Sequence, residues 1–280
     1  MISRFSHYAG VFVVFSGLAW GQIFAPVAVS SAALPSTPVD NALVVRSSTP
    51  DLPVPAAMPR MAPELALQVY QGRMNLQSQQ LAGYSAVTVI HAELPDTAQQ
   101  GEYELQRHFA APHTLEFKAL RYTGDGFVKS NVITRLLQSE VDHVQKDDTT
   151  LTAITNANYK FSYKGTSQVN GRLAHAFQLK PRSKRPGLFK GRIYISAFTG
   201  SLVRAEGGVV KSPSFFVKKI EFVQDYADVG SFTFPVYIHT EARARVIGRT
   251  VVDIYHRDYQ PVASQEQATH QVAVFSQSTE

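Results

Sequence analysis

The sequence has 280 residues and a formal net charge of +5. It contains 0 Cys, which excludes a disulfide framework, a thiolate metal site, a catalytic cysteine and the acylated cysteine of a lipoprotein. The mild basic excess suits contact with an anionic surface, although it is equally an ordinary solubility feature.

The N-terminus carries the pattern of a secretory signal. Arg4 and His7 precede an apolar run over residues 11–20, which is too short to span a bilayer securely. Small residues at Ala19 and Gly21 fit cleavage near residue 21, with residues 28–32 as later positions. The sequence therefore predicts a signal peptide within residues 1–32 and a soluble protein in the periplasm; a buried helix or a retained anchor are the alternatives.

Composition divides the rest of the chain. Proline, serine, threonine and alanine dominate residues 33–62, which predicts an extended linker. One domain is expected over residues 63–262, a length that supports a substantial core. The polar residues 263–280 predict a disordered tail.

Two helices are expected in the first half of the domain. Pro63 and Glu64 suit a first helical turn, and Gly83 is expected to end this helix. Its expected apolar stripe comprises Leu65, Val69, Met74, Leu76 and Leu81. A second helix is expected over residues 132–144, with a stripe of Ile133, Leu136, Leu137, Val141 and Val144.

The remaining segments favour strands. Three are expected between the helices, over residues 84–92, 102–109 and 113–122, and residues 147–158 predict a loop. From Tyr159 to Tyr259, alternating apolar and polar residues are interrupted at Gly165, Asn170-Gly171, Pro186-Gly187, Thr199-Gly200, Ser212-Pro213 and Gly230. The expected fold is mainly β (α+β): a half-open antiparallel β-barrel of roughly nine to eleven strands with two lid or plug helices.

One face of this sheet is apolar. A half-open sheet covered by two helices can hold an apolar ligand between the helices and the sheet, although the same residues can simply form a packed core. The candidate cavity residues are Leu115, Phe117, Leu173, Phe177, Ile193, Ile195, Ile220, Phe222, Phe234, Val236 and Ile238.

The order helix, three strands, helix and long antiparallel meander resembles the LolA-like family of periplasmic lipoprotein carriers. Two segments are similar to family strands and turns: residues 101–107 leading to 112–117, and residues 190–196 with 199–204. The resemblance implies a carrier that holds lipid or lipoprotein acyl chains, delivers them towards the outer membrane and uses no cofactor. It further implies that Arg107 tethers the lid to the barrel, although four residues separate Arg107 from Pro112, and a surface arginine is the alternative.

Two loops combine cations with apolar residues, as expected for contact with an anionic membrane or an envelope partner protein. Their candidate contact residues are Lys184, Arg185, Lys190, Phe215, Phe216, Lys218 and Lys219. Ordinary solvated hairpin tips are the alternative.

No catalytic motif occurs in the sequence. Asp253, His256 and Asp258 form the densest polar cluster, but a strand would place Asp253 on the opposite face from the other two, so no metal site is expected. We therefore expect a monomeric binding protein that is not an enzyme and has no nucleic-acid partner. An envelope-stress sensor or protein-interaction module on the same scaffold, and an unrecognised enzyme, are the alternatives.

Overall fold

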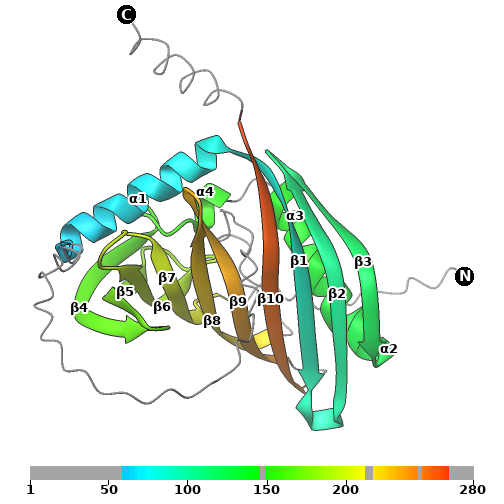
Figure 1. Cartoon of the computed structure of the whole chain (residues 1–280). Helices are drawn as coiled ribbons and strands as arrows, with labels where there is room; N and C mark the ends of the chain where they lie inside the picture. Colours follow the sequence, from blue (N-terminus) through cyan, green and yellow to red (C-terminus); the bar gives the residue numbers. More distant parts are fainter. Residues whose placement is uncertain (1–58, 146–148, 212–216, 245–247, 265–280) are drawn as a thin grey trace, which may run out of the picture.

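The computed structural model describes residues 59–145, 149–211, 217–244 and 248–264. The expected signal peptide, most of the expected linker and nearly all of the expected tail lie outside these residues. The described chain forms one ten-stranded sheet in the order β3-β2-β1-β10-β9-β8-β7-β6-β5-β4, in which every neighbouring pair is antiparallel. The sheet is open, with β3 and β4 at its edges (Figure 1), which confirms the predicted half-open architecture.

The strands alternate direction through short connections along most of the sheet. Their bounds are β1 Leu81–Leu94, β2 Gln99–Ala110, β3 Thr114–Gly124, β4 Tyr159–Val169, β5 Arg172–Pro181, β6 Phe189–Ser196, β7 Leu202–Val209, β8 Val217–Val229, β9 Phe232–Ala244 and β10 Gly248–Ala263. The helical segments are α1 Pro63–Gln80, the short turn η2 Pro95–Thr97, α2 Gly126–Val128, the π-helical turn η3 Lys129–Ile133, α3 Thr134–Gln145 and α4 Thr149–Thr152.

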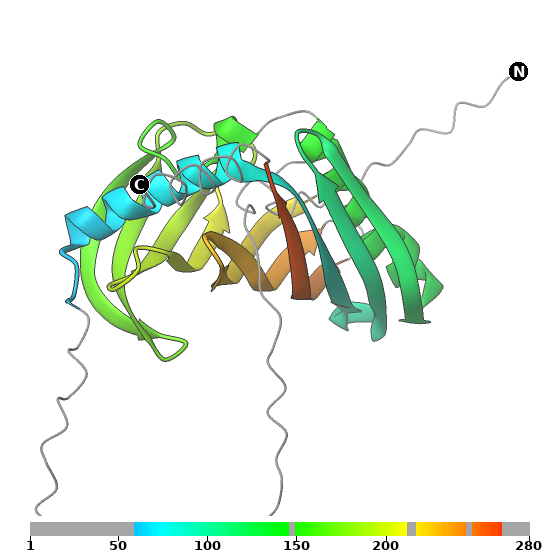
Figure 2. The same cartoon turned by 45° about the horizontal axis from the view of Figure 1, so that its top comes forward.

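The sheet is strongly curved, and Figure 2 shows it arching beneath α1. Register shifts interrupt several strand pairs, including β8 with β9 at Asp225 and Tyr226, and such bulges bend a strand and increase its twist. Gly191 and Gly207 face each other on β6 and β7, where a Cβ on Gly191 would collide with the carbonyl group of Glu206. Because glycine has no Cβ, the backbones of β6 and β7 can approach each other closely at these two residues.

Helix α1 packs on the sheet with a stripe different from the predicted one. Its buried residues are Ala66, Tyr70 and Gln77, whereas Leu65 and Leu76 are 47% and 51% exposed. The prediction was wrong for Leu65 and Leu76 because it weighed side-chain hydrophobicity alone, whereas Met74 is partly buried against the cluster that contains Tyr70 and Leu81 is 4% exposed. The helix also ends at Gln80 rather than Gly83, since the chain enters β1 there and pairs with β10 and β2.

The second helical region agrees with the predicted apolar stripe. Val132, Ile133, Leu136, Leu137 and Val144 are buried, and Val141 is partly buried against them. This region begins at residue 126, earlier than expected, because α2 and η3 continue directly into α3. The observed period matches an amphipathic helix that covers a sheet.

Both helical regions cover the same face of the sheet. Neighbouring inward-facing residues of β8 show this, since Ile220 packs in the α2–α3 cluster while Phe222 packs with Tyr70 of α1. A third cluster joins Val144 of α3 to aromatic residues of β1, β2, β9 and β10. We call this covered side of the sheet the concave face.

Two further predictions differ from the structure. Residues 147–158 were predicted to be a loop, but they include α4. Gly165 lies within β4 rather than between strands, at a register shift where its φ is +98°. Such a bulge absorbs a turn-forming glycine without ending the strand. Ser212-Pro213 lies outside the described residues.

Candidate functional site on the concave face

Nine of the eleven predicted cavity residues lie in or against three separate packed clusters, and Leu173 and Val236 belong to none of them. Those below 6% exposure are Leu115, Phe177, Ile193, Ile195, Ile220, Phe222, Phe234 and Ile238, whereas Phe117, Leu173 and Val236 are partly buried. Helix α1 contributes to the cluster over β4–β8, and α2–α3 to the cluster over β1, β2 and β8–β10. In this structure the buried residues of this set form packed core. Their role as a ligand cavity stays a prediction.

Arg107 joins the sheet to helix α3. It is only 6% exposed, so the alternative of a surface arginine is wrong. Its guanidinium forms an ion pair with Glu140 of α3 and donates a hydrogen bond from Nε to the Tyr84 hydroxyl at 2.9 Å. The guanidinium also lies 5.4 Å from the ring centre of Phe117. This buried contact has the geometry of a tether between the sheet and its helical cover.

Burial and neighbouring groups shift the pKa of Arg107 in opposite directions. Burial by itself lowers the pKa of Arg107, but Glu140 and Tyr84 outweigh it, so the pKa is raised and the charge is held. Burial, with a smaller contribution from Arg107, lowers the pKa of His256 to about 3. His256 is therefore neutral near pH 7, and its Nδ1 lies 2.9 Å from the Thr88 hydroxyl. The cluster thus holds one compensated ion pair in otherwise neutral surroundings.

Sequence reasoning missed Glu140, although a signal was present. Leu136, Glu140 and Val144 follow one another at four-residue spacing, which places a carboxylate within the apolar stripe of α3. A charged residue at such a position requires a partner, because an unpaired buried charge is costly. The stripe therefore indicated a buried counterion, but only the fold could identify Arg107.

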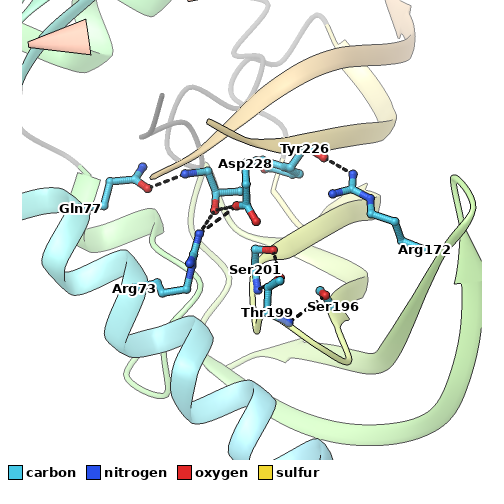
Figure 3. Close-up of polar contacts among 9 residues, drawn as sticks. Arg73, Gln77, Arg172, Ser196, Thr199, Ser201, Tyr226 and Asp228 are labelled. Carbon is cyan, nitrogen blue, oxygen red and sulfur yellow. Dashed lines mark hydrogen bonds and ion pairs between the residues drawn. The ribbon is translucent and has the colours of Figure 1, made fainter. Parts of the chain in front are cut away.

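Helix α1 is fastened to the sheet by polar contacts along its length, as Figure 3 shows for its C-terminal half. Arg73 pairs with Asp228 at 2.9 Å, and Gln77 accepts a hydrogen bond from the backbone N–H of Thr233 at 3.0 Å. Just before the helix, the backbone N–H of Met61 donates to the carbonyl of Ala197 at 2.8 Å. These contacts hold α1 against the sheet.

The predicted contact loops share one end of the sheet. Because the strands are antiparallel, the β5–β6 and β7–β8 connections leave from the same side. Lys184 and Lys190 are exposed there, and Lys219 is exposed but paired with Glu221 at 2.7 Å. Phe215, Phe216 and the side chain of Lys218 lie outside the described residues.

The apolar residues of the β5–β6 loop do not form an exposed contact surface. Leu188 and Phe189 are buried in the α1 cluster, because the loop folds inward against Ile154 and Tyr159. Arg185 donates hydrogen bonds to the Leu151 carbonyl and the Asn158 side chain, so it supports the loop structure. Lys184 and Lys190 are the exposed lysines of this loop that remain candidates for contact with a membrane or a partner protein.

A charged cleft of about 300 Å³ lies at the same end of the sheet, lined by Lys219, Glu221, Glu241, Ala242, Arg243 and Arg249.

The side chains of Asp253, His256 and Asp258 do not converge on one point. His256 is buried on the concave face, whereas Asp253 forms hydrogen bonds with Tyr237 and His239. Asp258 has a φ of +54° in an irregular stretch of β10. Within the described residues, no group of three or more His, Asp or Glu side chains is placed to hold a metal ion. No helix of that part of the chain has the length and apolar character to cross a membrane.

A family model described as a family of unknown function, DUF5686, matches residues 151–260. No curated protein matches the sequence. Solved structures similar to this chain include a putative outer membrane lipoprotein-sorting protein domain from Vibrio parahaemolyticus, with 11% identity, a TM-score of 0.37, and coverage of 71% of this chain and 92% of that one. A LolA superfamily protein from Nitrosomonas europaea has 8% identity, a TM-score of 0.32, and coverage of 68% and 92%.

The MucA/MucB complex from Pseudomonas aeruginosa also matches, with 10% identity, a TM-score of 0.25, and coverage of 71% of this chain and 99% of that one. At such identities and TM-scores these matches carry no argument about function.

Proposed function

We propose that this chain is a periplasmic carrier or binder of an acyl chain, lipid or lipoprotein, which holds the acyl part against the concave face and delivers it towards the outer membrane. The proposed role is non-catalytic, requires no cofactor and is performed by a monomer. A cleaved signal peptide and a Pro-rich linker before a single binding domain belong to the same proposal.

The observation that carries the proposal is the cover over the concave face. Helix α3 presents an apolar stripe to the sheet, and the buried Arg107–Glu140 pair joins the two. When this helix moves away, apolar side chains of the sheet lose their partners. An acyl chain can replace them, since each buried methylene is worth about 0.8 kcal/mol. The cover and the ligand then compete for the same surface, which provides a route for loading and release.

The first experiment measures binding of the apolar probe N-phenylnaphthylamine and analyses lipid extracted from the purified protein by mass spectrometry. We expect saturable binding and co-purified lipid. Glu140→Gln is expected to accelerate probe uptake about tenfold, because a hydrogen bond to a charged group contributes about 1.5–3 kcal/mol. Glu102→Gln, in the exposed pair with Arg121, is the matched control and should leave uptake unchanged. Absence of both lipid and saturable binding would contradict the carrier function.

A second prediction concerns membrane docking through the β5–β6 loop. Each cation near an anionic leaflet contributes about 1 kcal/mol, so Lys184→Glu with Lys190→Glu should weaken flotation with phosphatidylglycerol vesicles at low salt by about thirtyfold. The control is Lys118→Glu with Lys164→Glu, which changes the same charge at exposed positions on the two edge strands. The difference should fade at physiological ionic strength, where the Debye length is about 8 Å. Equal flotation of the two double variants would show that the loop lysines are ordinary solvated charges.

The second candidate function is an envelope sensor or protein-interaction module. It is favoured by the two open edges of the sheet, where Leu120 of β3 and Tyr163 of β4 are 51% and 43% exposed. An exposed strand edge can accept an extended segment of a partner protein. A stable crosslinked partner in the absence of co-purified lipid would favour this function over the carrier.

A further inference from the structure

Among the described residues, four side chains of the sheet carry buried polar atoms without hydrogen-bond partners: Gln224, Tyr226, Thr240 and Thr250. Tyr226 packs with Tyr70 in the α1 cluster, and the other three are the non-aromatic members of the set. Gln224 and Thr250 are 0% exposed and Thr240 is 2% exposed. Neither the amide oxygen nor the amide nitrogen of Gln224 has a partner, and the hydroxyls of Thr240 and Thr250 also have none. Leaving such groups unsatisfied is costly, so buried polar groups of this kind call for an explanation.

Strand register places the three residues in one diagonal line. Gln224 of β8 is opposite Ile238 of β9, and Thr240 is the next inward-facing residue of β9. Thr240 is opposite Val252 of β10, and Thr250 is the next inward-facing residue there. Diagonal neighbours of this kind lie about 7–8 Å apart in an antiparallel sheet. Neighbouring members of the line can therefore act on one small polar group, whereas Gln224 and Thr250, which are two steps apart, reach different polar atoms of the same ligand.

The line begins at the seam between the two helical covers and continues beneath the α2–α3 cover, where Thr250 is opposite Ala242. On one side of Gln224 is Ala205, which belongs to the α1 cluster, and on the other is Ile238, which belongs to the α2–α3 cluster. Figure 1 shows β8, β9 and β10 in the middle of the sheet, between the strands beneath α1 and those beside α3. An amphiphile on this face would thus have apolar surface on both sides of a central polar group.

We propose that Gln224, Thr240 and Thr250 form a subsite for the amide linkage of an acyl chain, an inference that rests on the proposed function. The Gln224 side chain offers an NH2 group that donates to the C=O of an amide and a carbonyl oxygen that accepts from its N–H. The Thr240 hydroxyl donates to the same carbonyl, and the Thr250 hydroxyl, one step further along the line, donates to a neighbouring acceptor of the ligand. An ester presents the carbonyl without the N–H, and an ether presents neither, so the subsite ranks the three linkages in the order amide, ester, ether.

The test is displacement of N-phenylnaphthylamine by N-ethyldodecanamide, ethyl dodecanoate and dodecyl ethyl ether. The wild-type protein should bind the amide about tenfold more tightly than the ether. Thr240→Val with Thr250→Val should remove most of this preference without lowering the melting temperature, since an apolar side chain of the same shape removes unsatisfied hydroxyls. Gln224→Met provides an independent variant, and it should bring amide binding to the level of the ester.

The outcomes separate the two proposals. Equal binding of all three compounds by the wild-type protein, or an amide preference retained in folded variants of all three residues, would overturn the subsite while leaving the carrier function intact. A lower melting temperature with the preference unchanged would assign the threonines a structural role and also overturn it. Failure of the wild-type protein to bind the probe would instead overturn the carrier function, and the subsite with it.

Discussion

Replacing Glu140 by alanine is expected to lower the free energy of unfolding by about 3–5 kcal/mol, because Arg107 would keep its charge in a buried site without a counterion. Both side chains of the pair are 8% exposed, so solvent would screen the unpaired charge of Arg107 only weakly. Urea denaturation, monitored by circular dichroism, measures the change directly.

The Arg107→Met, Glu140→Met double variant separates the pair from the packing around it. Replacing a buried ion pair by apolar residues of similar volume is often neutral or stabilising, so this variant should be at least as stable as the wild type. Glu102→Ala removes a carboxylate from an exposed pair with Arg121 and should cost less than about 1 kcal/mol. Equal costs for Glu140→Ala and Glu102→Ala would contradict the buried tether.

Phe234→Ala should cost about 3–5 kcal/mol of folding free energy, the usual range for truncating a fully buried phenylalanine. Phe234 is 1% exposed, and its ring centre lies 3.7 Å from that of Tyr259 and 5.1 Å from that of Tyr84. Phe234→Asp should cost at least as much, since it adds an unpaired carboxylate to the same site. The measurement is again the urea midpoint together with the slope of the transition.

Phe198→Ala is the matched control, because Phe198 is 40% exposed and its truncation should change stability by less than about 0.5 kcal/mol. A cost for Phe234→Ala as small as that of Phe198→Ala would show that the aromatic cluster is loosely packed. Loss of probe binding by Phe234→Asp would not by itself identify a cavity residue, because the substitution acts first on the core. Variants of Gln224, Thr240 and Thr250 avoid this difficulty, since they leave the apolar packing in place.

Local patterns in the sequence determined the class of fold and its second helix. Period-two alternation and regular turn signals predicted an open antiparallel sheet, and the structure has ten strands within the expected number. The stripe of η3 and α3 was predictable because Ile133, Leu136 and Val144 are large apolar residues at helical spacing. Both signals are local, so no knowledge of distant residues was needed.

The buried face of α1 and the interruptions of the strands required the tertiary structure. Helix α1 turns Ala66, Tyr70 and Gln77 inward, and Gln77 is bonded to the backbone of β9. The face that a weakly amphipathic helix buries depends on the shape and polar groups of the sheet beneath it. The hydrophobicity of the helix residues alone therefore could not predict the buried face of α1. Likewise, Gly165 is a turn signal in sequence, but pairing with β5 keeps it within a strand.

The sequence by itself thus determined where the chain alternates, where it turns and that one face of the sheet is apolar. Only the tertiary structure decided that Glu140 neutralises Arg107 across 33 residues, and that Gln224, Thr240 and Thr250 from three strands form one line. The physical reason is that alternation and capping act between neighbours in the chain, whereas charge pairing and polar clustering depend on distances that strand register and helix docking set.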